Sequence, residues 1–188
     1  MSKISFGTAA ETVNTKYLSD TFLLFYKLKE LVSIIGIVSH EFSHYIACKL
    51  LGLEIYEWKL FTLPKSESES ELVFGYFTYE NTTSYQKELL INIAPLFFNT
   101  LVATSLFVVI KPQTTLTTIL LAWMIICFYA KAIPSIQDIN NIKDNSKNAQ
   151  VGLSYYLIIP PLQFLAEVRI FGFDYIIAIT LYLTLLSL

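Results

Sequence analysis

Charged residues are scarce in this chain of 188 residues: they make up 15% of the sequence, against about 25% in ordinary soluble domains. Hydrophobic residues make up 54%, the mean hydropathy is +0.55, and the apolar residues come in long runs. These features argue against an ordinary soluble domain and predict an integral membrane protein. The length fits a single domain over residues 1–188.

Positive charge and cysteine are also limited. The net charge is −2, and all but one of the 13 basic residues are lysines, which gives no basis for a nucleic-acid partner. Cys48 and Cys127 both lie in apolar runs, so we expect buried free thiols rather than a disulfide. Residues 1–20 form a polar N-terminal segment without the apolar core and cleavage site of a signal peptide.

Long apolar runs predict four or five membrane-spanning helices, because a helix needs about 20 residues to cross a bilayer. The predicted helices cover residues 31–51, 89–110, 114–133, 151–168 and 173–188. Residues 111–113 leave room only for a short turn, so the second and third helices are expected to be antiparallel. Pro160 and Pro161 interrupt the fourth segment, which is therefore expected to be a broken helix.

The polar segment over residues 52–87 has a different pattern. Residues 54–61 alternate polar and apolar side chains, and residues 72–79 are rich in aromatic and β-branched ones, which predicts two strands. A Ser-Glu repeat over residues 66–71 would be the loop of a β-hairpin; the alternative is an interfacial loop with aromatic anchors. The predicted fold class is an all-α integral membrane helical bundle of four or five transmembrane segments, with a small β-hairpin after the first helix.

The only two histidines of the sequence lie four residues apart, in the motif His40-Glu41-Phe42-Ser43-His44 of the first predicted helix. Four residues are about one helical turn, so both imidazoles lie on one face and can bind the same zinc ion. Glu41 is placed to accept a proton from the water molecule that this ion activates. Ionisable side chains inside a membrane span are costly, which favours a functional site over a polar helix-packing patch.

Two histidines leave a zinc ion one protein ligand short of the three that a catalytic site usually has. Asp138 is the first candidate for the third ligand, because it follows the third apolar segment, and Glu167 is the second. Cys48 continues the stripe of His40 and His44, but it lies about 12 Å from His40 along the helix axis. Cys48 is therefore better explained as a small buried hydrophobe.

The sequence resembles the site-2 protease family of intramembrane zinc metalloproteases, as a minimal member without a regulatory domain. The resemblance covers about residues 31–141. Its specific part is the H-E-x-x-H motif inside an apolar helix. The later Ala47 and Gly52, and the strand-like segment that follows them, are similar to the family pattern as well.

Two further parts of the resemblance are looser. Ala94-Pro95 followed by Asn99 is similar to a family motif, although the asparagine lies one position further along than usual. Asp138, downstream of Pro134, matches the place of the family's aspartate ligand. The residues on either side of that aspartate, usually Leu and Gly in the family, are different here.

The resemblance implies an intramembrane zinc metalloprotease in which His40, His44 and Asp138 bind the metal and Glu41 is the general base. The substrate would be a transmembrane or membrane-adjacent peptide, and the strand-like segment would pair with it in extended form. Asn99 is a further candidate, as a stabiliser of the oxyanion.

Three other functions stay open at this point. A different membrane zincin would take Glu167 as its third ligand and act on soluble or membrane-adjacent peptides. A catalytically silent zinc-binding membrane protein would keep the histidines, and a zinc transporter would need further metal-binding residues along a path.

Lysines near the helix ends are more frequent on the hairpin side, which favours a multi-pass protein with its site nearer the cytoplasmic face. Glu88 and Asp174 are expected to be interfacial, and the sequence predicts no oligomeric state.

Overall fold

The computed structural model describes residues 6–14, 20–60, 71–80, 82–110, 114–146 and 153–187. In these ranges the chain is mostly helical, with one small antiparallel sheet. The helices are α1 (Asp20–Val32), α2 (Ile34–Leu50), α3 (Tyr85–Val109), α4 (Thr115–Ala130), α5 (Ile136–Ser146), α6 (Leu153–Val168) and α7 (Phe173–Leu186), with a short 3-10 helix, η1 (Arg169–Phe171), before α7. The strands are β1 (Phe6–Asn14), β2 (Ile55–Lys59) and β3 (Glu71–Glu80).

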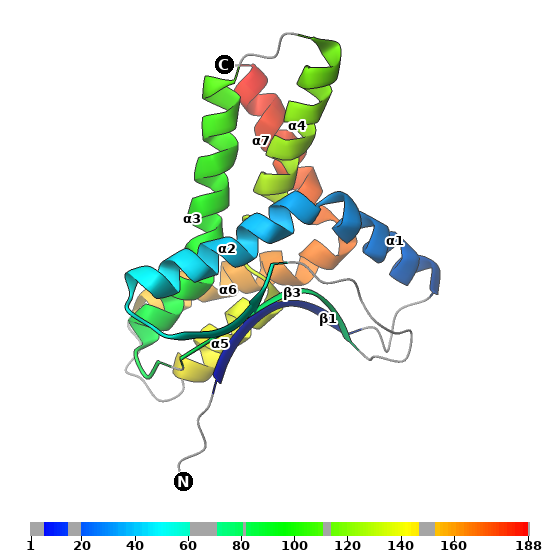
Figure 1. Cartoon of the computed structure of the whole chain (residues 1–188). Coiled ribbons are helices and arrows are strands. Elements are labelled where there is room, and N and C mark those ends of the chain that lie inside the picture. Colours follow the sequence, from blue (N-terminus) through cyan, green and yellow to red (C-terminus); the bar gives the residue numbers. More distant parts are fainter. Residues whose placement is uncertain are drawn as a thin grey trace.

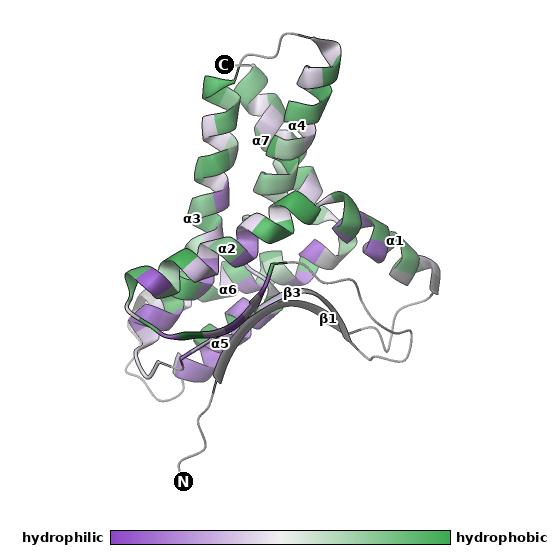
Figure 2. Cartoon of the chain, viewed as in Figure 1, coloured by the Kyte–Doolittle hydropathy of each residue, from purple (hydrophilic) through white to green (hydrophobic). Residues whose placement is uncertain are grey.

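Helix α2 crosses the middle of the molecule and separates two regions (Figure 1). Helices α4 and α7 and the C-terminal part of α3 rise together on one side of it, whereas the sheet and α5 lie on the other side. Hydrophobic residues predominate in the α3, α4 and α7 region, and hydrophilic residues are concentrated in α5 (Figure 2). The helix that carries both histidines therefore lies at the boundary between an apolar and a more polar region.

The strand prediction is confirmed for β2 and β3, which pair in antiparallel fashion. No strand was predicted in the polar N-terminal segment, but residues 6–14 form β1 and pair with the other edge of β3. The sheet therefore has three strands in the order β1-β3-β2, with β3 in the centre. The predicted loop over residues 66–71 lies almost wholly outside the described residues.

The first predicted helix over residues 31–51 corresponds to α2, but a further helix, α1, precedes it and was not expected. The two helices are bent by 71° at Ser33. The Ser33 hydroxyl donates hydrogen bonds to the carbonyls of Lys29 and Glu30, each at 3.1 Å. Such bonds from a serine back to the preceding turn are a known cause of helix bending.

The C-terminal region differs from the prediction in where its helix is interrupted. Helix α6 continues through Pro160 and Pro161, although a break was expected there. The chain turns instead at Gly172, whose φ of 85° is a left-handed conformation that glycine adopts readily. Helix α7 starts directly after it.

Fewer membrane-length helices are present than the four or five that the sequence predicts. Among the described residues, α3 alone is long and apolar enough to cross a membrane as one helix. There are up to three candidate spans if each bent pair, α1 with α2 and α6 with α7, counts as one. Helix α4 is apolar but shorter, and this gives one to three candidate spans in all.

Candidate metal centre

Three buried side chains from two helices converge beside the sheet: His40 and His44 of α2 and Asp138 in the first turn of α5. Nε2 of His40 lies 3.2 Å from Oδ2 of Asp138, and Nε2 of His44 lies 3.4 Å from Oδ1 of the same carboxylate. One ligand atom from each residue falls within 4.8 Å of the others, as in a group that could hold a metal ion. The sequence placed these three residues in one site, and the structure brings them together.

A proline in α3 explains how His44 is oriented. Nδ1 of His44 lies 2.8 Å from the carbonyl oxygen of Ile91. In an unbroken helix this carbonyl would accept from the N–H of residue 95, but Pro95 has no N–H to donate. The carbonyl of Ile91 is thus left free for the imidazole. Because a carbonyl only accepts, Nδ1 of His44 carries the proton and Nε2 presents its lone pair toward Asp138.

His40 is oriented by a backbone carbonyl at the C-terminal end of α4. Nδ1 of His40 lies 2.8 Å from the carbonyl oxygen of Lys131, the C-cap residue of α4. Carbonyls at a helix C-terminus have no partner within the helix, so this one is available to accept. It also accepts a bond of 2.9 Å from the amide nitrogen of Asn99, whose oxygen accepts from Ser39 at 2.5 Å. Asn99 therefore links α2 to α4. Its amide group makes these two hydrogen bonds and does not point to the place of an oxyanion.

Asp138 is fixed by a reciprocal pair of hydrogen bonds with Ser135. The backbone N–H of Ser135 donates to Oδ2 of Asp138 at 2.7 Å, and the N–H of Asp138 donates to the Ser135 hydroxyl at 3.1 Å. This is a capping box at the start of α5, and the spacing Ser-x-x-Asp was a sequence signal for it that we missed. Burial raises the pKa of the Asp138 carboxyl, but His44, His40 and the Ser135 amide lower it by more. Its net pKa lies below the ordinary value, so Asp138 is an anion.

The donor set fits a metal ion on the evidence of its own geometry. Nδ1 of each histidine faces a backbone carbonyl, and Nε2 of each faces a carboxylate oxygen of Asp138, within hydrogen-bond distance for His40. Two acceptors that face each other in a buried site are satisfied by a proton or by a metal ion between them, and this group could hold a metal ion. A tetrahedron with bonds of about 2.0–2.1 Å has edges of about 3.3–3.4 Å, close to the two separations observed. Nε2 of His44 and Oδ1 of Asp138 also make no hydrogen bond with any described residue.

Glu41, the candidate general base, lies between the histidines and the sheet. Its carboxylate is buried, with the residue 1% exposed. A Cβ atom added to Gly75 of β3 would lie 2.8 Å from Cγ and 3.1 Å from Oε1 of Glu41. The central strand therefore passes directly against this side chain, and only glycine leaves room for it.

Other candidate residues fall outside the group of three. Glu167 is exposed on α6, where its carboxylate accepts a hydrogen bond from Gln163 at 2.6 Å. Cys48 is buried in an apolar cluster with Phe77 and Ile91, as expected for a small hydrophobe, and both cysteines are free thiols. The first choice for the third ligand is thus the one that the structure places with the histidines.

Glu88 was expected to be interfacial, and this expectation is wrong, because the residue is 1% exposed. Its Oε1 accepts hydrogen bonds from the Tyr79 hydroxyl at 2.5 Å and from the Asn92 amide at 2.9 Å, and Asn92 in turn accepts one from Asn141 at 3.2 Å. Burial, and next the charge of Glu88, raise the pKa of Tyr79, so its hydroxyl stays protonated and donates. The network joins β3, α3 and α5 beside the metal ligands.

Asp174 was likewise expected to be interfacial and is instead buried in a cluster of ion pairs. Lys29 lies 3.1 Å from Glu30 and 3.5 Å from Asp174, and Arg169 lies 3.6 Å from Asp174. The ammonium of Lys131 pairs with Glu30. Lys131 therefore links this cluster to the metal centre, because its carbonyl holds His40 while its side chain joins the ion pairs.

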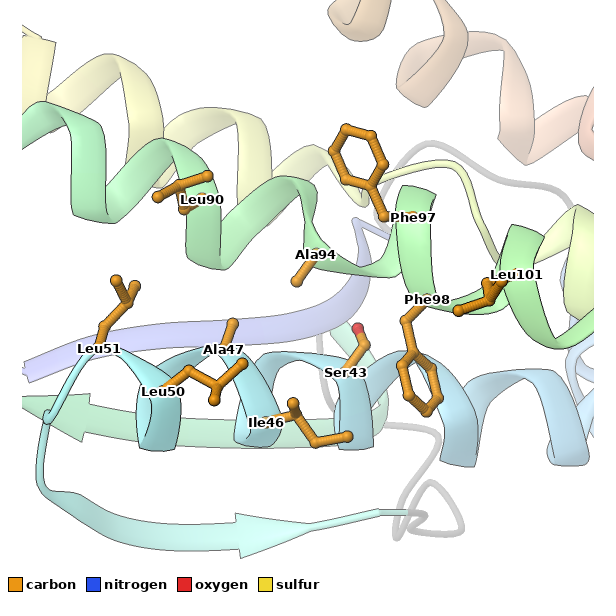
Figure 3. Close-up of a pocket in the computed structure, with 10 residues that line it drawn as sticks. All are labelled: Ser43, Ile46, Ala47, Leu50, Leu51, Leu90, Ala94, Phe97, Phe98 and Leu101. Carbon is orange, nitrogen blue, oxygen red and sulfur yellow. The ribbon is translucent and has the colours of Figure 1, made fainter.

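An apolar groove of about 370 Å³ runs between α2 and α3. Figure 3 shows its lining: Ser43, Ile46, Ala47 and Leu50 from α2, Leu51 at its end, and Leu90, Ala94, Phe97, Phe98 and Leu101 from α3. Ser43 supplies the polar atom of the lining, and its hydroxyl donates to the carbonyl of His40 at 2.6 Å. The groove therefore lies beside the turn that carries the histidines.

Comparisons of the chain with protein-family models, with curated proteins and with solved structures find no match. The case for a function therefore depends on the motif and on the geometry of this centre.

Proposed function

We propose that the chain is an intramembrane zinc metalloprotease of the site-2 protease type. The observation that carries the proposal is the convergence of His40, His44 and Asp138, with Glu41 beside the first histidine. The membrane-spanning character of the chain and the identity of the metal are parts of the same proposal.

Zinc suits the donor set, because two imidazoles and one carboxylate are a set of three protein ligands that leaves a fourth position open for chemistry. A zinc ion held in this way activates a water molecule for attack and polarises the carbonyl that is attacked. Carboxylate and imidazole donors without a thiolate also fit a catalytic rather than a structural zinc site.

The roles of the chain's own groups follow from their places. Glu41 accepts a proton from the attacking water and returns it to the leaving amine of the cleaved peptide. The carbonyls of Ile91 and Lys131 keep both imidazoles in the tautomer that leaves Nε2 free. The sheet covers Glu41 and limits the entry of bulk water to the carboxylate.

The composition supports a membrane-embedded site. Helix α3 supplies the carbonyl that holds His44 and is also the helix with the length and apolarity of a span. The apolar groove between α2 and α3 suits an apolar peptide segment in contact with lipid. A transmembrane or membrane-adjacent peptide is the proposed substrate class, and a small bias in the distribution of lysines favours a site nearer the cytoplasmic face.

The proposal is tested with the purified full chain in phosphatidylcholine vesicles that contain a panel of fluorescently labelled transmembrane peptides. We expect cleavage that stops on chelation of zinc and resumes on its return. The Glu41→Gln variant should bind zinc like the wild type and cleave nothing, because the amide cannot accept the proton. Equal cleavage by both proteins at equal zinc content would refute the assigned mechanism.

A further inference from the structure

Strand β1 occupies one whole edge of the central strand β3. The two strands pair antiparallel from Phe6 opposite Glu80 to Asn14 opposite Glu71. Because β2 takes the other edge of β3, β1 is an outer strand of the sheet. Any extended peptide that pairs with this edge of β3 would need the place that β1 now fills.

Strand β1 also contacts the helices that form the candidate metal centre. Besides β3, β1 contacts α5, which carries Asp138, and α2, which carries His40, Glu41 and His44. The elements that supply the metal ligands and the general base are therefore also the neighbours of β1. Figure 1 shows β1 in front of α5, at the lower edge of the sheet.

The register places the middle of β1 next to the catalytic carboxylate. Ala10 pairs with Tyr76 and Thr12 with Val73, and the register shifts between these two pairs. Gly75, the residue of β3 that packs against Glu41, lies within this interval. The backbone of residues 10–12 thus runs beside the part of β3 that packs against the proposed general base.

The resemblance implies that an extended substrate strand pairs with the sheet, and we infer that residues 6–14 act as an internal competitor for it by filling this edge of β3, beside α5 and α2. The inference rests on the proposed protease function. An edge strand of a sheet binds peptides through main-chain hydrogen bonds, which place a peptide bond at a fixed distance from the strand regardless of side chains. A protease must hold its substrate in extended form, because a helix keeps its amide groups in internal hydrogen bonds.

The sequence of β1 suits an occupant that can be displaced. Phe6–Asn14 reads FGTAAETVN and contains one glycine and two adjacent alanines, residue types that are depleted in strands. An outer strand also pairs along only one edge. As part of the same chain, β1 nevertheless competes at a high effective concentration, so that it fills the surface until a better strand arrives.

The first test locks β1 in place with a cross-strand disulfide. Thr8 and Thr78 are direct partners, and the Cβ atoms of opposed residues lie close enough to be bridged. We expect oxidised Thr8→Cys/Thr78→Cys protein to cleave its peptides at least tenfold more slowly than the same protein after reduction. The single Thr8→Cys variant, treated with the same oxidant, is the control and should keep its rate.

The second test releases β1 and does not depend on proteolysis. Consecutive N–H groups of a strand point to opposite edges, so Thr8→Pro/Ala9→Pro removes one ladder hydrogen bond whichever of the two residues makes it. A labelled synthetic peptide with the sequence of residues 6–14 should bind this variant at least tenfold more tightly than it binds the wild type, measured by fluorescence anisotropy. Thr8→Val/Ala9→Val, which keeps both N–H groups, should bind the peptide like the wild type.

The results of these two tests distinguish the inference about β1 from the proposed protease function. If the oxidised and reduced forms cleave equally and the peptide binds both proline and valine variants alike, β1 is an ordinary structural strand and the inference is overturned. If the peptide binds the proline variant selectively but no zinc-dependent cleavage occurs in any form, the strand-binding surface stands and the protease function fails.

Discussion

Both imidazoles of the metal centre are held by backbone carbonyls that the surrounding helices leave free. In α3 the cause is a proline, and in α4 it is the end of the helix. Hydrogen bonds to the far nitrogen of a metal-binding histidine fix the ring and its tautomer, and their loss typically lowers metal affinity about 10–100-fold. In the proposed zinc site, Pro95 would therefore act through the Ile91 carbonyl and His44, as a positioning residue.

Replacing Pro95 by alanine tests this role. The new N–H would compete with His44 for the Ile91 carbonyl, so we expect Pro95→Ala to lower zinc affinity by about tenfold. Competition titration with a zinc chelator gives the measurement. Pro160→Ala makes the same exchange in α6, away from the centre, and should leave affinity unchanged. Identical zinc affinities of the wild type and Pro95→Ala would show that Pro95 does not position His44 for metal binding.

The third ligand is tested by two isosteric amide variants. Asp138→Asn removes the anionic charge that faces both imidazoles, and we expect it to weaken zinc binding at least as much as the loss of a metal-bound group does, about 100-fold or more. Glu167→Gln alters an exposed carboxylate on α6 and should bind zinc normally. The reverse order of affinities would favour the zincin with a glutamate ligand.

The side chains of the candidate metal centre could be predicted from the sequence, but the backbone groups that orient them could not. His40, Glu41 and His44 share one helical turn, and this pattern is visible without any structure. Backbone acceptors such as the Ile91 carbonyl have no side-chain signature. The position of Pro95 four residues later was a local signal for a free carbonyl, but nothing in the sequence shows that His44 reaches it.

At the scale of elements, β3 packs closely against α2 at Glu41, the proposed general base. Gly75→Ala would place a methyl group within 3.1 Å of both the Glu41 side chain and the Leu60 carbonyl. We expect this variant to bind zinc like the wild type and to lose most of its cleavage activity, because Glu41 or the strand must shift. Gly52→Ala is the control: its φ of 71° makes it strained, but a Cβ there meets no atom.

The Gly52→Ala control should lower thermal stability and keep the activity of the folded protein, whereas Gly75→Ala should lose most of its activity. Similar activities for the two alanine variants would show that the contact between β3 and Glu41 has no catalytic consequence.

Elements with strong local patterns were predicted and elements that depend on distant partners were not. Period-two alternation identified β2, aromatic and β-branched residues identified β3, and long apolar runs identified α3 and α4. Strand β1 has a weak strand sequence and forms by pairing with residues more than 50 positions away. Helix α1 was missed because Lys27, Lys29 and Glu30 interrupt its apolar pattern, and two of these charges are buried only through contacts with later helices.

At the scale of the whole molecule, the buried ion pairs tie the N-terminal and C-terminal helices to the metal centre. Glu30 of α1 pairs with both Lys29 and Lys131. The side chains of Glu30 and Lys131 are fully buried, and that of Lys29 is 6% exposed. Removing one member of a buried ion pair leaves an uncompensated charge, which typically costs about 3–5 kcal/mol.

Glu30→Gln should therefore lower the free energy of unfolding by about 3–5 kcal/mol, measured by denaturant titration in detergent. We expect a smaller loss of zinc affinity as well, because Lys131 both pairs with Glu30 and holds His40. Glu167→Gln removes an exposed carboxylate and serves as the matched control. A loss of stability no larger than that of the control would show that the cluster does not support the fold.

The central claim is that His40, His44 and Asp138 form the shell of a single zinc ion. X-ray absorption at the zinc edge, on the purified full chain loaded with one equivalent of zinc, measures that shell directly. The account predicts two imidazole nitrogens and at least one further light ligand at about 2.0–2.2 Å, with the imidazole signal lost in His40→Ala/His44→Ala. A shell dominated by sulfur at about 2.3 Å, or a spectrum unchanged by the double substitution, would contradict it.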